Sequence, residues 1–141
     1  MFLCKKLVWI AIKFLIRVKF SKVPKISTSD LAAWLERAVD RPVLLDARTP
    51  EEYAIGHLWG AKLVPASLEE LKLDLSVPIV VYCSIGYRSA IVVKRLQAMG
   101  YKKIFNLEGS IFQWANERRP LNRKGDRIHP HNQFWGLLLD L

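Results

Sequence analysis

The stretch from Pro78 to Arg88 constrains the fold of this chain more than any other. It begins with the uninterrupted apolar run PIVVY, which ends at Tyr82, and continues through Cys83 and Gly86 into a segment with helical spacing. A β-branched run without polar alternation is typical of a strand buried on both faces of a parallel sheet. A cysteine between such a strand and a helix lies where α/β folds bind their ligands.

Strands and helices alternate along the rest of the central segment. Ser27 is expected to cap the first helix, because its side chain can accept a hydrogen bond from the backbone of Asp30. The hydrophobic pattern predicts helices at 28–39, 50–53, 67–71, 89–99 and 110–117, and strands at 43–45, 61–64, 78–82 and 103–107. This alternation predicts an α/β fold with a mainly parallel sheet. The 141 residues suit one such domain with short extensions.

The positive charge of the chain is confined to its two ends. The formal net charge is +9, yet residues 26–117 contain ten cations and eleven acids. Residues 1–25 contain seven cations and no acid, and residues 118–141 add a net charge of +3. A nucleic-acid-binding domain carries its basic residues on the folded surface that meets the phosphates. We therefore expect no nucleic-acid partner.

The two cysteines, Cys4 and Cys83, are far apart in the sequence and form no CxxC pair. Disulfide-rich secreted domains have many more cysteines for their length, so we expect a reducing compartment, the cytoplasm. His129 and His131 alone make a poor metal site. We expect neither a metal nor another cofactor.

Residues 1–21 are expected to form a basic amphipathic helix. The longest uncharged run in its apolar part, Leu7–Ile12, is shorter than the roughly 20 apolar residues of a membrane-spanning helix. On a helical wheel, Lys6, Lys13 and Arg17 lie within about 40° of one another. They lie opposite an apolar face formed by Leu3, Leu7, Phe14, Leu15 and Val18.

Three interpretations of this helix are open. It can lie in a membrane interface, held by its apolar face and by the attraction of lysine and arginine to anionic lipid. It can dock on its own domain or on a partner, or it can span the membrane with Lys13 extended toward the headgroups. We favour peripheral membrane association through residues 1–20.

Residues 83–89 are the candidate reactive segment. Backbone N–H groups are expected to point at the sulfur of Cys83, and the positive helix end and the charge of Arg88 favour its thiolate. Gly86 allows the loop to curl with its amides inward, which makes a nest for an anion, and Ser89 is expected to cap the helix. The alternative is a buried structural cysteine, which is common after an apolar strand.

Four motifs occur in the order and at the spacing of one known family. They are LLDARTPEEY from Leu44, GHLWGA from Gly56, VYC from Val81 followed by Gly86, Arg88 and Ser89, and NLEG from Asn106 followed by Trp114. Together these motifs resemble the rhodanese family of single-domain sulfurtransferases over about residues 22–120.

This resemblance implies a rhodanese-like α/β fold whose five-stranded, mostly parallel sheet is flanked by helices on both faces. The domain would cover residues 22–120, with the N-terminal helix at 1–21 and a C-terminal tail at 121–141. Cys83 would take sulfane sulfur from a donor such as thiosulfate as a persulfide and pass it to a thiol or another thiophilic acceptor. The loop residues that would bind the donor are Ser84, Ile85, Gly86, Tyr87, Arg88 and Ser89.

The chain departs from better-known family members at two positions, which keeps alternatives open. Ser84 stands where they often have an arginine, and Gly109-Ser110 replaces their two glycines. With one cation in the loop, a persulfide carried by another protein is an alternative donor to thiosulfate. A non-catalytic, membrane-associated interaction module is one alternative function, and a phosphatase or arsenate reductase is another. The four residues between Cys83 and Arg88 disfavour the latter, because the related cell-cycle tyrosine phosphatases use a Cys-x5-Arg loop.

The other motif residues are interpreted as structural. Arg48 and Glu52 are four residues apart around a helix start and are expected to pair, and Asp46 is expected to brace the active loop. His57 is expected to pack and to form hydrogen bonds rather than act as a base. The apolar run at 134–139 could pack on the domain, bind a partner or contact a membrane.

Overall fold

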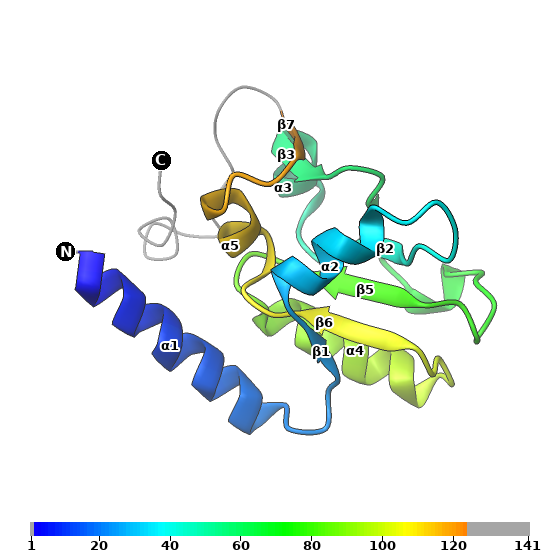
Figure 1. Ribbon diagram of the computed structural model, residues 1–141. Helices are drawn as coiled ribbons and strands as arrows, with labels where there is room; N and C mark the ends of the chain where they lie inside the picture. The colour runs from blue at the N-terminus through cyan, green and yellow to red at the C-terminus, as the bar shows by residue number, and fades with distance from the viewer. Residues whose placement is uncertain (1, 124–141) are drawn as a thin grey trace.

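The computed structural model describes residues 2–123, and a five-stranded sheet forms its centre (Figure 1). In spatial order the strands are β1 (Lys25–Ile26), β6 (Ile104–Leu107), β5 (Ile79–Tyr82), β2 (Val43–Asp46) and β4 (Lys62–Leu63). Every neighbouring pair in this sheet runs parallel. The α/β fold with a five-stranded parallel sheet is therefore confirmed.

Helices cover both faces of the sheet, and the residues of β5 alternate between them. The helices are α1 (Phe2–Lys19), α2 (Thr28–Leu35), α3 (Pro50–Ile55), α4 (Tyr87–Ala98) and α5 (Ser110–Asn116), with a short 3-10 helix η1 (Leu68–Glu70). Ile79 and Val81 pack in the core beneath α4. Val80 and Tyr82 pack in the core beneath α2 and α5. Because β5 is buried on both faces, its uninterrupted apolar sequence has a direct structural explanation.

A second, two-stranded sheet joins segments that lie far apart in the sequence. Strand β3 (Gly56–Leu58) pairs antiparallel with β7 (Leu121–Arg123). The sequence predicted neither of these strands, nor β1, because two or three residues are too few to show an alternating pattern.

Helix α2 begins where it was predicted to begin and ends earlier. The backbone N–H of Asp30 donates a hydrogen bond of 3.1 Å to Ser27 Oγ, so the expected cap is confirmed. The helix ends at Leu35 rather than at residue 39. Directly after this end, the backbone N–H groups of Glu36 and Arg37 bond to carbonyls three rather than four residues back, so the α-helical pattern stops there.

Helix α1 docks on the domain with one face. Trp9 and Ile12 pack against the core beneath α2 and α5. Arg17 donates two hydrogen bonds of 2.7 Å to the carboxylate of Glu108. Figure 1 shows α1 on the side toward which the β5 and β6 arrows point. Docking on its own domain, one of the three interpretations, is therefore what the structure shows.

The opposite face of α1 is apolar and exposed. Its large side chains are each more than half exposed; we call Leu3, Leu7, Phe14, Leu15 and Val18 the outer strip. Within residues 2–123, no helix has the length and apolar character needed to cross a membrane. Helix α1 thus has one apolar face on the protein and another that no described residue covers.

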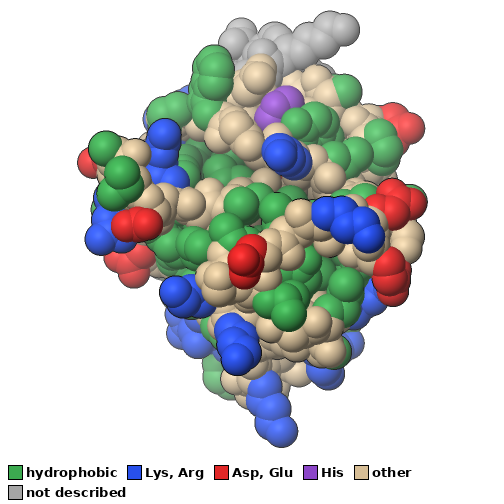
Figure 2. All heavy atoms as spheres, turned by 90° about the vertical axis from the view of Figure 1, so that its right-hand side faces the viewer, with side chains coloured by type: hydrophobic (Ala, Val, Ile, Leu, Met, Phe, Trp, Pro, Cys, Tyr) green, Lys and Arg blue, Asp and Glu red, His purple; other side chains and the backbone are tan. Residues whose placement is uncertain are grey.

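The side of the domain away from α1 carries charges of both signs (Figure 2). Basic and acidic side chains appear there among hydrophobic ones. This mixed surface agrees with the near-neutral charge of residues 26–117.

Candidate active site

Cys83 directly follows β5 and faces the start of α4. The residue is buried, and its sulfur accepts a hydrogen bond of 3.2 Å from the backbone N–H of Gly86. Gly86 has φ 108°, a left-handed conformation that favours glycine, and it forms the N-cap of α4. This conformation turns the amide of Gly86 back toward the sulfur, where it can stabilise negative charge.

Ser89 does not cap α4, contrary to the prediction. The helix begins at Tyr87, so Ser89 lies inside its first turn. Its Oγ lies 3.4 Å from the sulfur of Cys83 and 2.6 Å from Oδ1 of Asn106 in β6. Asn106 donates from Nδ2 to the carbonyl of Gly86 at 2.9 Å, which turns Oδ1 toward Ser89. The serine hydroxyl therefore lies between the sulfur and a fixed amide oxygen.

Arg88 turns toward Glu52. Its guanidinium donates to the carboxylate of Glu52 at 2.8 and 3.1 Å and to Ser84 Oγ at 2.9 Å. Burial acts to raise the pKa of Glu52, but the hydrogen bonds from Arg88 and from the backbone of Thr49 lower it to about 2. The positive charge beside Cys83 is thus balanced by a buried carboxylate.

Arg48 does not pair with Glu52, contrary to the prediction. It forms a fully buried ion pair with Asp46, with Nη2 2.7 Å from Oδ2. Nη2 also donates to the carbonyl of Gly56. Burial opposes the charged form of Arg48, but the hydrogen bond and charge of Asp46 raise its pKa above the usual value. Asp46 therefore holds Arg48, and Arg48 in turn holds the start of β3. That Asp46 braces the active loop stays a prediction.

Ser110 is a site residue that the sequence interpretation missed. Its Oγ accepts a hydrogen bond of 3.2 Å from the backbone N–H of Cys83 and donates one of 2.8 Å to the carbonyl of Leu107. The residue is fully buried and has φ 49°. The signal was present, because a serine occupies the second position of the family's Gly-Gly pair. The hydroxyl of Ser110 ties the end of β6 to the start of the reactive loop.

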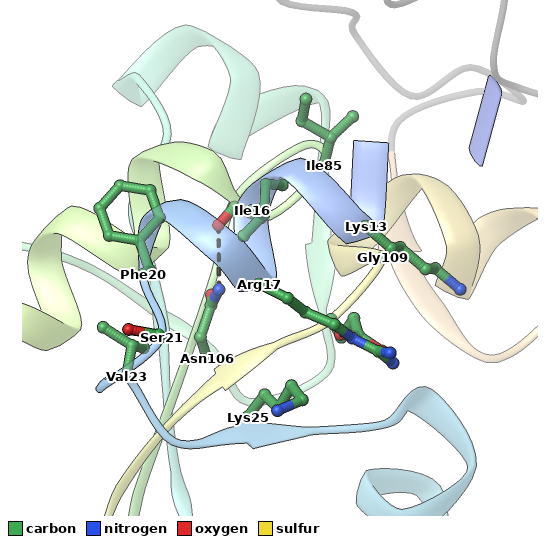
Figure 3. Close-up of a pocket in the computed structure, with 12 residues that line it drawn as sticks. Lys13, Ile16, Arg17, Phe20, Ser21, Val23, Lys25, Ile85, Asn106 and Gly109 are labelled. Atoms are coloured by element: carbon green, nitrogen blue, oxygen red, sulfur yellow. Dashed lines mark hydrogen bonds and ion pairs between the residues drawn. The ribbon is translucent and has the colours of Figure 1, made fainter. Parts of the chain in front are cut away.

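Helix α1 lies over the reactive loop (Figure 3). Ile16 of α1 and Ile85 of the loop line a small cavity beside Asn106, and the dashed line marks the bond from Asn106 to the carbonyl of Gly86. Phe20, which follows α1, packs edge-on against Tyr87 with ring centroids 5.3 Å apart. The N-terminal helix is therefore part of the surroundings of the site.

A second cavity of about 400 Å³ lies directly against Cys83. Ser84, Ile85, Tyr87 and Arg88 of the predicted loop line it, together with apolar residues of α1. The structure thus brings the predicted loop residues to one place, with Gly86 holding the sulfur and Ser89 behind it.

His57 packs against Tyr53 and lines neither of the two cavities at the reactive loop. Its Nδ1 is 2.8 Å from the carbonyl of Tyr53, and the two rings stack with centroids 3.8 Å apart. Within residues 2–123, no three His, Cys, Asp or Glu side chains are grouped so that they could hold a metal. His129, His131 and the apolar run at 134–139 lie outside the described residues.

Known proteins share this fold and sequence pattern. A family model described as Rhodanese-like domain matches residues 29–117. The probable adenylyltransferase/sulfurtransferase MoeZ of Mycobacterium tuberculosis is 34% identical over 105 residues, which are 71% of this chain and 26% of MoeZ. A sulfurtransferase of Allochromatium vinosum is 36% identical over 84 residues, 56% of this chain and 77% of that protein. The crystal structure of a rhodanese-like domain protein from Staphylococcus aureus has a TM-score of 0.64 at 31% identity, covering 73% of this chain and all of that one.

The chain belongs to the rhodanese-like domain family. The matched segment spans about a quarter of MoeZ, so the likeness there concerns one part of a longer protein. The relatives named as sulfurtransferases connect the family to sulfur transfer.

Proposed function

We propose that this protein is a sulfurtransferase that carries sulfane sulfur as a persulfide on Cys83. The observation that carries the proposal is the hydrogen bond from the backbone N–H of Gly86 to the sulfur, at the carboxyl end of a buried parallel strand. An N–H donor at the start of a helix stabilises a thiolate, and a thiolate is the nucleophile that sulfur transfer needs. The names of two relatives support the same chemistry.

The reaction would proceed in two steps. The Cys83 thiolate attacks the outer sulfur of the donor, the bond from that sulfur to the rest of the donor breaks, and the leaving group departs with the electron pair. An acceptor thiolate then attacks the outer sulfur of the Cys83 persulfide and releases the cysteine thiolate. The N–H of Gly86 stabilises the sulfur of Cys83 whenever it carries negative charge.

The donor can be thiosulfate or a persulfide carried by another protein. Arg88 lines the cavity, but its charge is balanced by Glu52, and Ser84 directly after Cys83 adds a hydroxyl and no charge. This balance favours a donor with less charge than the thiosulfate dianion.

Mass spectrometry of the intact protein tests the proposal. After incubation with thiosulfate or polysulfide, we expect a gain of about 32 Da, one sulfur atom, that dithiothreitol removes. The Cys4→Ser variant is the matched control and should keep the adduct, because Cys4 is exposed on α1. Cys83→Ser should lose it. If neither the wild-type chain nor Cys4→Ser gains the adduct with any donor, the non-catalytic interaction module is favoured instead. Release of phosphate from an aryl phosphate would favour the phosphatase alternative.

We also propose that α1 holds the domain at an anionic membrane surface. The outer strip is exposed and apolar, and the helix carries no acid but has Lys6 on one flank and Lys19 on the other. Burial of apolar side chains in the interface and an attraction of roughly 1 kcal/mol per cation would act together. Localisation at the cytoplasmic face follows from the reducing compartment that the two free cysteines suggest.

Vesicle co-sedimentation of the full chain tests the membrane proposal. We expect binding to vesicles that contain phosphatidylglycerol and weaker binding to phosphatidylcholine alone. The double variant Leu7→Glu/Phe14→Glu changes only exposed positions of the outer strip and should lose binding. The double variant Val39→Glu/Leu75→Glu places the same two charges at exposed apolar positions outside α1 and is the control. Equal binding by the wild-type chain and the double variant would refute the proposal.

A further inference from the structure

The cavity at the reactive sulfur has apolar walls from two elements. Its volume of about 400 Å³ is in the range of sites for small organic molecules. Ile12, Leu15 and Ile16 of α1 form one wall, and Ile85 and Tyr87 of the loop contribute apolar surface next to the sulfur. A substrate that reaches the sulfur through this cavity therefore contacts α1 as well as the loop.

The polar groups of the cavity already have partners. Arg88 is the one cation among its lining residues, and both of its terminal nitrogens donate to Glu52. Ser84 Oγ accepts from Arg88. The hydroxyl of Tyr87 accepts a hydrogen bond from Lys19. A charged substrate would have to compete with these bonds, whereas an apolar one would leave them in place.

Leu15 connects the cavity to the outer strip. It lines the cavity, and 65% of its surface is exposed. At Leu15, the exposed apolar surface of α1 therefore continues into the cavity beside Cys83, with no charged side chain in between. An apolar chain could lie along this path with its end group at the sulfur.

We propose that the acceptor is a thiol carried on an apolar carbon chain, and that Ile12, Leu15 and Ile16 select for it. This inference rests on the sulfur-transfer function proposed above. The chain would lie against α1 while its thiol group reaches the persulfide of Cys83.

The transfer step is balanced. The acceptor thiol first loses its proton to solvent, and its thiolate attacks the outer sulfur of the protonated Cys83 persulfide. A new S–S bond forms to the acceptor, and the bond from the outer sulfur to Cys83 Sγ breaks. The electron pair of the broken bond stays on Cys83 as a thiolate, and the outer sulfur keeps its proton in the product hydropersulfide. No external oxidant or reductant is needed.

Discharge kinetics of the loaded protein test the inference. The full chain is first loaded with thiosulfate or polysulfide, its persulfide is verified by mass, and it is then mixed with primary thiols of two to six carbons. We expect the second-order rate constant to rise about two- to fourfold per methylene, after correction for the rate with a small-molecule persulfide. Hexanethiol should exceed 6-mercaptohexanoate, its carboxylate-bearing counterpart, by about tenfold or more.

Two leucine variants distinguish a role of the cavity wall formed by α1 from an unspecific effect of a leucine-to-glutamine substitution. Leu15→Gln changes an exposed wall residue and should flatten the dependence on chain length. Leu75→Gln makes the same change at an exposed position outside the cavity and should keep the wild-type dependence. Failure to load Cys83 would refute the sulfur-transfer function itself. Normal loading with rate constants that are equal for all chains, or highest for the carboxylate, would overturn only this inference.

Discussion

Two arginine–carboxylate pairs near the carboxyl ends of the strands differ in burial and in what they touch. Arg48 and Asp46 are both fully buried, and Arg48 also donates a hydrogen bond to the carbonyl of Gly56 at the start of β3. In the second pair the carboxylate of Glu52 is buried, but 25% of the Arg88 side chain is exposed and lines the cavity at the reactive sulfur. The Arg48–Asp46 pair thus stabilises the fold, whereas the Arg88–Glu52 pair sets the net charge beside the reactive sulfur.

The difference comes from the partner that each arginine finds. Arg48 lies two residues from Asp46, and Asp46 Oδ1 accepts hydrogen bonds from both the backbone and the side chain of Arg48. Arg88 pairs with Glu52 across 36 residues of sequence, which ties α4 to the start of α3. A third pair, Arg17 with Glu108, ties α1 to the domain and is the most exposed of the three, because about half of the Arg17 side chain is exposed. We therefore expect the loss in free energy of unfolding on breaking a pair to be larger the more deeply the pair is buried.

The largest effect is expected for Arg48→Ala. The substitution leaves the fully buried carboxylate of Asp46 without a partner, and such losses cost about 3–5 kcal/mol. Urea denaturation followed by circular dichroism measures this cost. The double variant Asp46→Leu/Arg48→Met should recover part of the stability, because no unpaired charge remains. A loss below about 1 kcal/mol for Arg48→Ala would place this pair with exposed ones.

The second effect is a dependence of stability on pH that comes from Glu52. Its pKa is lowered to about 2 in the fold from the usual 4.5, so its contribution is complete above about pH 4.5 and is lost as the pH falls toward 2. The shift corresponds to about 3 kcal/mol. Urea denaturation between about pH 5 and pH 3 should show a steeper loss for the wild-type chain than for Glu52→Gln. Parallel pH profiles would show that Glu52 does not carry this dependence.

A smaller effect is expected on the rate of sulfur loading. Glu52→Gln removes the charge that balances Arg88, so an anionic donor should react faster. A change of about 1 kcal/mol corresponds to about a fivefold rise in the rate constant with thiosulfate. Stopped-flow measurement of sulfite release gives this constant, and a donor without net charge serves as the control. A slower reaction with thiosulfate would mean that Glu52 positions Arg88 for the donor.

The smallest effect is expected for the exposed pair of α1. Arg17→Ala should lower the free energy of unfolding by less than about 1 kcal/mol, because solvent screens this pair. Denaturation at low and high salt should show that the difference shrinks as salt rises. A larger, salt-independent loss would indicate that Arg17 contributes through packing instead.

The sequence was informative where a local pattern determines the structure. The apolar run ending at Tyr82 predicted a buried strand, and the positions of Cys83 and Gly86 predicted a loop at its end. The strands β1, β3 and β7 were missed because their pairing partners, rather than their own patterns, define them. Arg48 was assigned the wrong partner for a related reason. Helical spacing suggested Glu52, but in the structure Arg48 forms its ion pair with Asp46.

The N-terminal helix shows the same limit at a larger scale. Its wheel predicted an apolar face opposite Lys6, Lys13 and Arg17, and those apolar residues are indeed exposed. Nothing in the pattern indicated that Ile12 and Ile16, on another face, would line the cavity at Cys83. A helix that is apolar on two faces can dock and still expose apolar surface, and only the docked structure shows which face does which.

Transfer of an isotopically labelled sulfur tests the central claim most directly. Thiosulfate labelled in its outer sulfur with the heavy isotope sulfur-34 is incubated with the full chain, and the protein is separated from excess donor before a thiol is added. We expect the peptide that contains Cys83 to gain about 34 Da. After the thiol is added, the label should appear in the acceptor, and the Cys83 peptide should return to its original mass. Label that reaches the acceptor equally well with the Cys83→Ser variant would contradict sulfur transfer through this residue.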